Sequence, residues 1–269
     1  MKVMIFSGSH PRHHFIHQAI LGSGMDCAAV VMERESLLPS APTNISTQDK
    51  ENFVRHFRER DIIESKFFGK TDSKEVFSNI PTLFCQSDEL NSFKTLKFVQ
   101  SFNPDWVFIF GVDIIKDPLL KALPKNKVNL HLGLSPWYRG SATLFWPFYF
   151  LQPQFAGVTF HQIVPEADAG DIIHQSVPDI KLGDGIHDVS ARAVLNAKDD
   201  LLKLISLYSQ KGSWNHFAQK SSGSLYLSRH FKPEHLRVIY DLYDNDIVDH
   251  YLNNQLQADH PLLFKQPGI

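Results

Sequence analysis

Two stretches of the sequence carry side chains whose types and spacing suit the transfer of an acyl group to an amine. Asn129 and His131 are two positions apart at the end of a predicted strand, so their side chains lie on the same face of a sheet. Asp168 stands in an Ala-Asp-Ala-Gly segment, which is typical of a tight loop before another strand. An amide and an imidazole can stabilise a tetrahedral oxyanion, and a carboxylate can help to remove the proton that the attacking nitrogen sheds.

The elements that must position these side chains alternate between strand and helix. Short apolar, often β-branched runs are separated by segments in which apolar residues recur at helical spacing. The expected strands are residues 2–7, 27–32, 82–85, 106–110, 127–131, 157–164 and 171–177. This alternation predicts an α/β fold with an open, mostly parallel Rossmann-like sheet that is covered by helices.

The expected helices divide the chain into a large and a small part. Residues 46–70 are predicted to form a charged surface helix outside any site, and residues 186–207 a helix that packs back on the sheet. After residue 208 the sequence becomes rich in serine and glycine around a short strand, and a further helix is expected over residues 233–252. We therefore predict a catalytic domain over residues 1–207 and a C-terminal appendage of strand and helix over residues 208–269.

Composition excludes several classes of function. The net charge is −2, which gives a nucleic acid little to bind. The two cysteines, Cys27 and Cys85, form no CxxC pair, so they are expected to be small core residues rather than zinc ligands or a disulfide. The longest apolar stretch, residues 142–151, is too short to cross a membrane, and the start of the chain has no apolar region of secretory length. We expect a reduced, cytoplasmic protein that binds neither nucleic acid nor membrane.

The stretches NLHLGLSPWYRG (129–140) and GVTFHQIVPEADAGDII (157–173), taken together, resemble the 10-formyltetrahydrofolate-dependent formyltransferases. This superfamily includes glycinamide ribonucleotide transformylase, methionyl-tRNA formyltransferase and the sugar-nucleotide N-formyltransferases, and the resemblance runs from residue 1 to about residue 208. It implies the same open sheet, with the active site beyond the carboxyl ends of the strands. It also implies that 10-formyltetrahydrofolate is the co-substrate and that no metal is required.

The resemblance implies a role for each candidate residue. Asn129 and a protonated His131 would stabilise the oxyanion, and Asp168, through His131 or a water, would help to move the amine proton to the departing folate nitrogen. The pterin would be bound by two loops, one with Gly111, Ile114, Ile115 and Lys116 and the other with Pro165, Glu166 and Ala167. The alternative for the first loop is an ordinary buried strand end. His161, in the strand before Asp168, is not favoured as a second catalytic imidazole.

The segment GSHPRHH (8–14) departs from the family pattern, because it stands where the purine enzyme has a glycine-rich loop for the substrate phosphate. Pro11 removes an amide donor and bulky side chains replace small ones, which argues against glycinamide ribonucleotide as the acceptor. We expect Arg12, His10 and Tyr138 to contact the acceptor instead. His10, His13, His14 and His17 have helical spacing, which suggests either a metal site or, as we prefer, a solvated loop and helix start.

The C-terminal part discriminates among acceptors. Residues 208–269 are too few and not lysine-rich enough for an RNA-binding domain, which disfavours a tRNA acceptor. Residues 222–236 suit the appendage of sugar-nucleotide N-formyltransferases, which helps to form the acceptor site or a homodimer. We therefore favour the amine of a nucleotide-linked amino sugar, an activity that usually serves polysaccharide biosynthesis. The alternatives are an amino acid, a peptide precursor or methionyl-tRNA as acceptor, or a non-catalytic folate-binding homologue.

Overall fold

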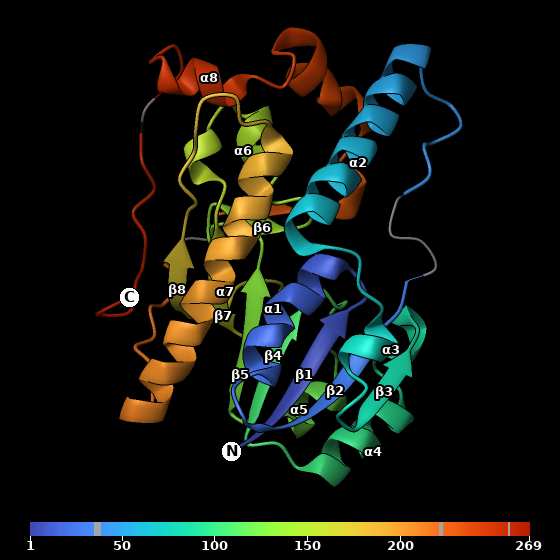
Figure 1. Cartoon of the computed structure of the whole chain (residues 1–269), viewed down its shortest axis with the longest axis vertical. Coiled ribbons are helices and arrows are strands. Elements are labelled where there is room, and N and C mark those ends of the chain that lie inside the picture. Colours follow the sequence, from blue (N-terminus) through green and yellow to red (C-terminus); the bar gives the residue numbers. More distant parts are fainter. Residues whose placement is uncertain (35–38, 221–222, 258) are drawn as a thin grey trace.

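The computed structural model describes residues 1–34, 39–220, 223–257 and 259–269, and its main feature is a seven-stranded sheet (Figure 1). The strands follow the spatial order β3-β2-β1-β4-β5-β7-β8. The first five are parallel, β7 runs antiparallel to β5, and β8 runs antiparallel to β7. Their bounds are β1 Lys2–Gly8, β2 Asp26–Met32, β3 Thr82–Cys85, β4 Trp106–Phe110, β5 Asn126–His131, β7 Val158–Gln162 and β8 Ile172–Ser176. The predicted α/β fold with a mostly parallel sheet is confirmed.

Helices cover both faces of the sheet, which explains why β1 and β4, near its centre, are largely apolar. α1 (Pro11–Leu21) and α7 (Ile186–Lys211) lie across one face, and α4 (Phe93–Phe102) and α5 (Leu119–Ala122) cover the other (Figure 1). The alternating side chains of β1 enter two cores, with Val3 and Ile5 in the first and Met4 and Phe6 in the second.

Both cysteines are free and buried, as predicted, and burial raises the pKa of each thiol to about 11.

A third apolar cluster joins the C-terminal part to the rest of the chain. Phe145, Trp146 and Phe148 pack there against Leu236 and Ile239, so most of the aromatic stretch 145–150 belongs to the core.

The remaining helices are α2 Thr47–Phe68, α3 Ser73–Val76, α6 Trp146–Tyr149 and α8 Ile247–Leu252, with short helical turns η1 Ser87–Glu89, η2 Pro153–Phe155, η3 Ser228–His230, η4 Pro233–His235 and η5 Val238–Leu242. A two-stranded parallel sheet pairs β6 (Tyr138–Gly140) with β9 (Ser224–Tyr226).

The C-terminal helix predicted over residues 233–252 is wrong, because this segment is broken into η4, η5 and α8. Asp244 and Asn245 both adopt positive φ values, of 42° and 67°, and a left-handed backbone cannot continue a right-handed helix. The Asn245 side chain accepts a hydrogen bond from the Ile186 amide at 3.1 Å, so it caps α7 instead. α7 itself continues past the predicted end at residue 207 and stops at Gly212, whose φ is 73°.

The division of the chain into two parts at residue 207 stays a prediction.

Within the described ranges, no helix combines the length and the apolar character that crossing a lipid bilayer requires.

Candidate active site

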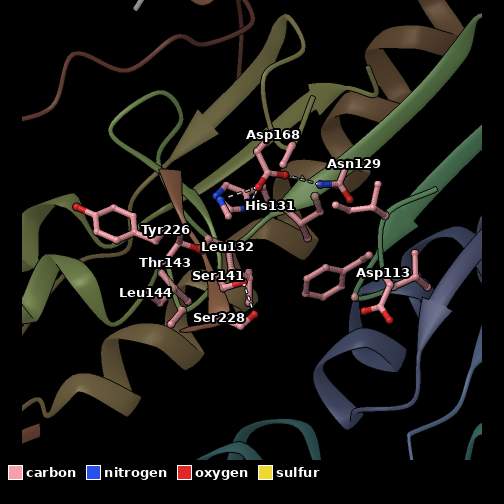
Figure 2. A pocket seen from close by; sticks show the side chains of 18 of the residues that line it. Asp113, Asn129, His131, Leu132, Ser141, Thr143, Leu144, Asp168, Tyr226 and Ser228 are labelled. Carbon is pink, nitrogen blue, oxygen red and sulfur yellow. Dashed lines mark hydrogen bonds and ion pairs between the residues drawn. The ribbon is translucent and has the colours of Figure 1, made fainter. Parts of the chain in front are cut away.

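Asn129, His131 and Asp168 meet at the end of β5 (Figure 2). Asn129 and His131 project from the same face of this strand, and Asp168 reaches them from the loop between β7 and β8. The Asn129 Nδ2 donates to Asp168 Oδ1 at 3.4 Å, and His131 Nδ1 lies 3.3 Å from Asp168 Oδ2. The structure therefore brings together an amide, an imidazole and a carboxylate from two distant stretches of sequence.

His131 is held with both ring nitrogens against oxygen atoms that accept hydrogen bonds. Its Nε2 donates to the Tyr138 carbonyl oxygen at 2.8 Å, while its Nδ1 faces the Asp168 carboxylate. Burial lowers the pKa of His131, and the carboxylate and the carbonyl act in the opposite direction. The imidazolium can therefore donate at two positions, but burial makes it ready to release a proton.

Asp168 remains ionised although it is largely buried. Burial raises its pKa, but His131, the hydrogen bond with His161 and the Gly140 amide outweigh this effect and hold the pKa of Asp168 well below its usual range. The Gly140 N–H donates to Asp168 Oδ2 at 2.9 Å. The backbone of Asp168 is left-handed, with a φ of 48°, and this conformation points the carboxylate toward β5. Asp168 is thus a fixed anion in the centre of the cluster.

His161 is a fourth member of the cluster, although its sequence context does not favour it as a second catalytic imidazole. Its Nδ1 donates to the Gln162 carbonyl oxygen at 2.7 Å, and its Nε2 lies 3.1 Å from Asn129 Nδ2 and 3.2 Å from Asp168 Oδ1. The antiparallel register pairs Asn129 with His161 directly. Sequence patterns do not reveal which residues face each other across two strands 32 positions apart, so no local signal could have placed His161 here.

The cluster opens into a cavity of about 1140 Å³. The two predicted pterin loops lie along it: Gly111, Ile114, Ile115, Lys116, Pro165, Glu166 and Ala167 all line its wall. Asn91 holds the first loop, because its Nδ2 donates to the Ile114 carbonyl oxygen at 3.0 Å and its Oδ1 accepts from the Lys116 amide at 2.7 Å. The loop is therefore a shaped wall of the cavity rather than only a strand end.

Gly111 begins this loop with a φ of 83°, and a side chain there would collide with the ring of His13. We expect Gly111→Ala to lower the free energy of unfolding by about 2–4 kcal/mol, because a left-handed backbone and overpacking act together. Gly212→Ala is the matched control: its φ is 73°, but nothing lies within 4 Å of the added methyl group, so a loss of only about 1 kcal/mol is expected. Denaturant unfolding measures both, and equal losses would contradict the role of the His13 contact.

The residues predicted to contact the acceptor occupy three different places. Arg12 lines the cavity and forms an ion pair with Glu64 of α2. His10 lines a smaller neighbouring pocket instead. Tyr138 does not line the cavity: its side chain is buried, and its hydroxyl donates to Gln152 Oε1 at 2.9 Å. Only its carbonyl oxygen takes part in the cluster, through His131.

The histidines at residues 10–17 are buried, so the prediction of a solvated loop and helix start is wrong. Pro11 begins α1 immediately, and the helix lies on the sheet with His13 and His17 edge-on to Phe110 and Phe108. His14 contacts the hydroxyls of Thr71 and Ser73 at 2.7 and 3.0 Å. Burial lowers the pKa of His10 and His17 to about 3 and that of His14 to about 4. No group of three or more metal-ligating side chains occurs in the part of the chain that the structure describes.

α2 lines the far end of the cavity, although its sequence predicts only a surface helix. His56, Phe57, Arg60, Glu64 and Phe68 face the cavity from this helix. Because the charged residues Arg60 and Glu64 stand on the side that faces the cavity, the apolar pattern of the helix does not reveal this face. Residues 225–229 and Phe231 of the C-terminal part line the same end. In Figure 2, Tyr226 and Ser228 lie on this side of the cluster, and Asp113 lies on the opposite side.

Comparison with known proteins gives one family and a set of similar folds. The family described as formyl transferase matches residues 2–205. A sugar N-formyltransferase from Shewanella sp. has a TM-score of 0.58 and 15% identity, covering 89% of this chain and 87% of that one. The N-formyltransferase from Helicobacter canadensis, solved with folinic acid and dTDP-3-aminofucose, has a TM-score of 0.54 and 14% identity over 89% and 80%. Phosphoribosylglycinamide formyltransferase from Anaplasma phagocytophilum has a TM-score of 0.55 and 15% identity over 84% and 98%.

Proposed function

Because this chain belongs to the formyl transferase family, we propose that it transfers a formyl group from 10-formyltetrahydrofolate to the amine of a nucleotide-linked amino sugar. The observation that carries the proposal is the meeting of Asn129, His131 and Asp168 in the wall of one large cavity. The cavity, about 1140 Å³ in volume, is large enough for two substrates to meet at this cluster.

The cluster supplies each group that formyl transfer needs. The acceptor nitrogen attacks the formyl carbon, a C–N bond forms, and the carbonyl oxygen becomes an oxyanion. Asn129 donates a hydrogen bond to this oxygen, and His131 does so when one of its two N–H groups leaves its present acceptor, the Tyr138 carbonyl oxygen or the Asp168 carboxylate. These hydrogen bonds are the largest expected contribution to the rate. Asp168, acting through His131 or a water, helps to remove the proton that the amine nitrogen loses. That proton is returned to the folate nitrogen as its bond to the formyl carbon breaks.

The two pterin loops and the far end suit different substrates. The backbone around Ile114 and Lys116 would read the pterin, which fits the folinic acid bound by the Helicobacter canadensis protein. The far end carries the cations Arg12, Arg60 and Arg229, which fit the diphosphate of a nucleotide sugar such as the dTDP-3-aminofucose of that same protein. The C-terminal residues 225–229 would contact the acceptor here.

The similarity to phosphoribosylglycinamide formyltransferase leaves a purine precursor as the competing acceptor. The segment after β1 argues against it. A side chain at Gly8 would meet the ring of His13, so this ring fills the space above the glycine, and Pro11 supplies no amide donor. A phosphate could not approach this turn as closely as a glycine-rich loop allows.

The test combines binding with product formation. Purified protein is screened by thermal shift with uridine, thymidine and guanosine diphosphate amino sugars, each with a reduced folate present, and hits are incubated with 10-formyltetrahydrofolate. We expect at least one nucleotide-linked amino sugar to raise the melting temperature and to gain a formyl group by mass spectrometry. Glycinamide ribonucleotide, free amino acids and methionyl-tRNA are the comparison acceptors, and formylation of one of these alone would overturn the choice of acceptor. Folate binding without transfer to any of them would favour a non-catalytic homologue.

A further inference from the structure

The loop that carries Asp168 is held by side chains from outside it. The peptide before Asp168 is fixed by Arg139, whose Nε and Nη2 donate to the Ala167 carbonyl oxygen at 3.1 and 2.8 Å. The peptide after it is fixed by Gln219, whose Nε2 donates to the Asp168 carbonyl oxygen at 2.9 Å and to the Gly170 carbonyl oxygen at 2.7 Å. The Ser135 hydroxyl makes a longer contact with the Asp168 carbonyl oxygen at 3.4 Å.

We propose that Gln219, in the C-terminal part of the chain, is a positioning residue for the Asp168 carboxylate. The φ and ψ angles of Asp168 are the rotations between the two peptide planes that Arg139 and Gln219 hold. Its φ of 48° lies in the left-handed region, which aspartate tolerates better than most residues but which still costs more than a right-handed backbone, so the external hydrogen bonds stabilise the loop in this conformation. Gln219 does not line the cavity, so it acts on the carboxylate through the backbone rather than on a substrate.

The orientation of the Gln219 side chain is determined by its contacts. Both N–H groups of the amide point at carbonyl oxygens, and its Oε1 is buried without a hydrogen-bond partner among the described residues. In the opposite orientation of the amide, Oε1 would face the Asp168 and Gly170 carbonyl oxygens, and neither of these can donate a hydrogen bond to it. The chain beside Gln219 is anchored by a two-way backbone bridge between Phe217 and Ile172, with N···O distances of 2.8 and 2.9 Å. The donor is therefore fixed to the sheet that also carries the cluster.

Loss of this support should change the environment of the catalytic groups without removing any of them. If Asp168 relaxes, its Oδ2 moves away from the Gly140 amide, now at 2.9 Å, and from His131 Nδ1, now at 3.3 Å. Asp168 raises the pKa of His131, whereas burial and the charges of His161 and Arg139 lower it. Displacing the carboxylate should therefore lower the pKa of His131 further and weaken transition-state stabilisation. The kinetic consequence rests on the proposed function, but the change at His131 does not.

The experiment uses Gln219→Met, which keeps length and volume but has no donor, and Gln219→Glu, which presents only acceptors at neutral pH. Lys220→Ala, at the exposed neighbouring side chain, is the matched control. The pKa of His131 is measured by NMR titration of histidine-labelled protein, with its signal identified by its loss in His131→Gln. In parallel, kcat and KM are measured with the acceptor found by the screen.

For both Gln219 variants we expect the His131 pKa to fall by at least about 0.5 and kcat to fall about ten-fold, with KM changed less than about three-fold. Lys220→Ala should match the original protein. An unchanged His131 pKa in a variant whose melting temperature is normal would overturn the proposal, as would a rise in acceptor KM with unchanged kcat. If no acceptor is ever found, the NMR titration alone decides the role of Gln219, so failure of the proposed function is seen separately.

Discussion

Asp168→Asn is expected to lower kcat by about 10³-fold, while the dissociation constant of the reduced folate changes less than about three-fold. Asparagine keeps the shape of the side chain but cannot accept a proton, and it removes the negative charge that His131 and His161 face at 3.3 and 3.2 Å. A factor of 10³ corresponds to about 4 kcal/mol of transition-state stabilisation. Steady-state rates of formyl transfer and titration with the reduced folate measure the two effects separately.

Asp171→Asn is the control for this substitution, because Asp171 follows the same loop but is exposed to solvent and does not line the cavity. It should retain the original rate. An Asp168→Asn protein with more than about a tenth of the original kcat would show that the carboxylate does not carry the proton. A protein that loses folate binding together with activity would place Asp168 in the binding of the folate.

The sheet could be predicted from the sequence chiefly because β1, β2 and β4 are buried on both faces and form nearly continuous apolar runs. β3 and β4 have the predicted bounds, residues 82–85 and 106–110. Asn129 and His131 were placed on one face by the period of two in a strand, which needs no knowledge of the neighbours. The expectation that Asp168 faces them came from the resemblance to a family, since nothing in a loop sequence states where the loop points.

Contacts between distant segments could not be predicted. His161 joins the cluster through the register of β5 and β7, and Gln219 reaches the Asp168 loop from a segment about 50 residues away along the chain. The break in the C-terminal helix depends on Asn245, whose side chain caps α7 rather than continuing its own helix. Polar residues that serve another element in this way give a misleading local pattern.

The burial of the histidines near the start of the chain is hard to predict for a related reason. Polar side chains of this kind predict a segment that is exposed to solvent. A neutral imidazole, however, can also pack in a core as an aromatic ring does. His17 packs against Phe77 and Phe108, and His13 packs against Phe110. Further along the chain, His56 and His187 are buried with their ring centroids 4.5 Å apart. Each of these rings must stay uncharged for the packing to hold, which makes the fold sensitive to acid.

We expect the free energy of unfolding to fall steeply as the pH decreases from about 6.5 toward 5. Burial lowers the pKa of His10, His17 and His187 to about 3 and that of His14 to about 4, and it holds the pKa values of His13 and His56 well below the usual one. In the unfolded chain these histidines titrate near pH 6.5, so between pH 6.5 and 4 the unfolded state binds more protons than the folded state. Each such histidine contributes a slope of up to about 1.4 kcal/mol per pH unit. Their stabilisation is thus complete above pH 6.5 and is lost on acidification.

One substitution can assign part of this slope to a single ring. His17→Leu removes a fully buried imidazole from the contact with Phe77 and Phe108. It should reduce the slope of the unfolding free energy between pH 6 and 5 by about 1.2 kcal/mol per pH unit, whatever it does to the free energy of unfolding at pH 7. His216→Leu, at an exposed histidine, should leave the slope unchanged. Denaturant unfolding at several pH values measures the slopes. A His17→Leu protein with the original slope would mean that this imidazole already carries a proton in the folded state, which its apolar surroundings would then have to tolerate.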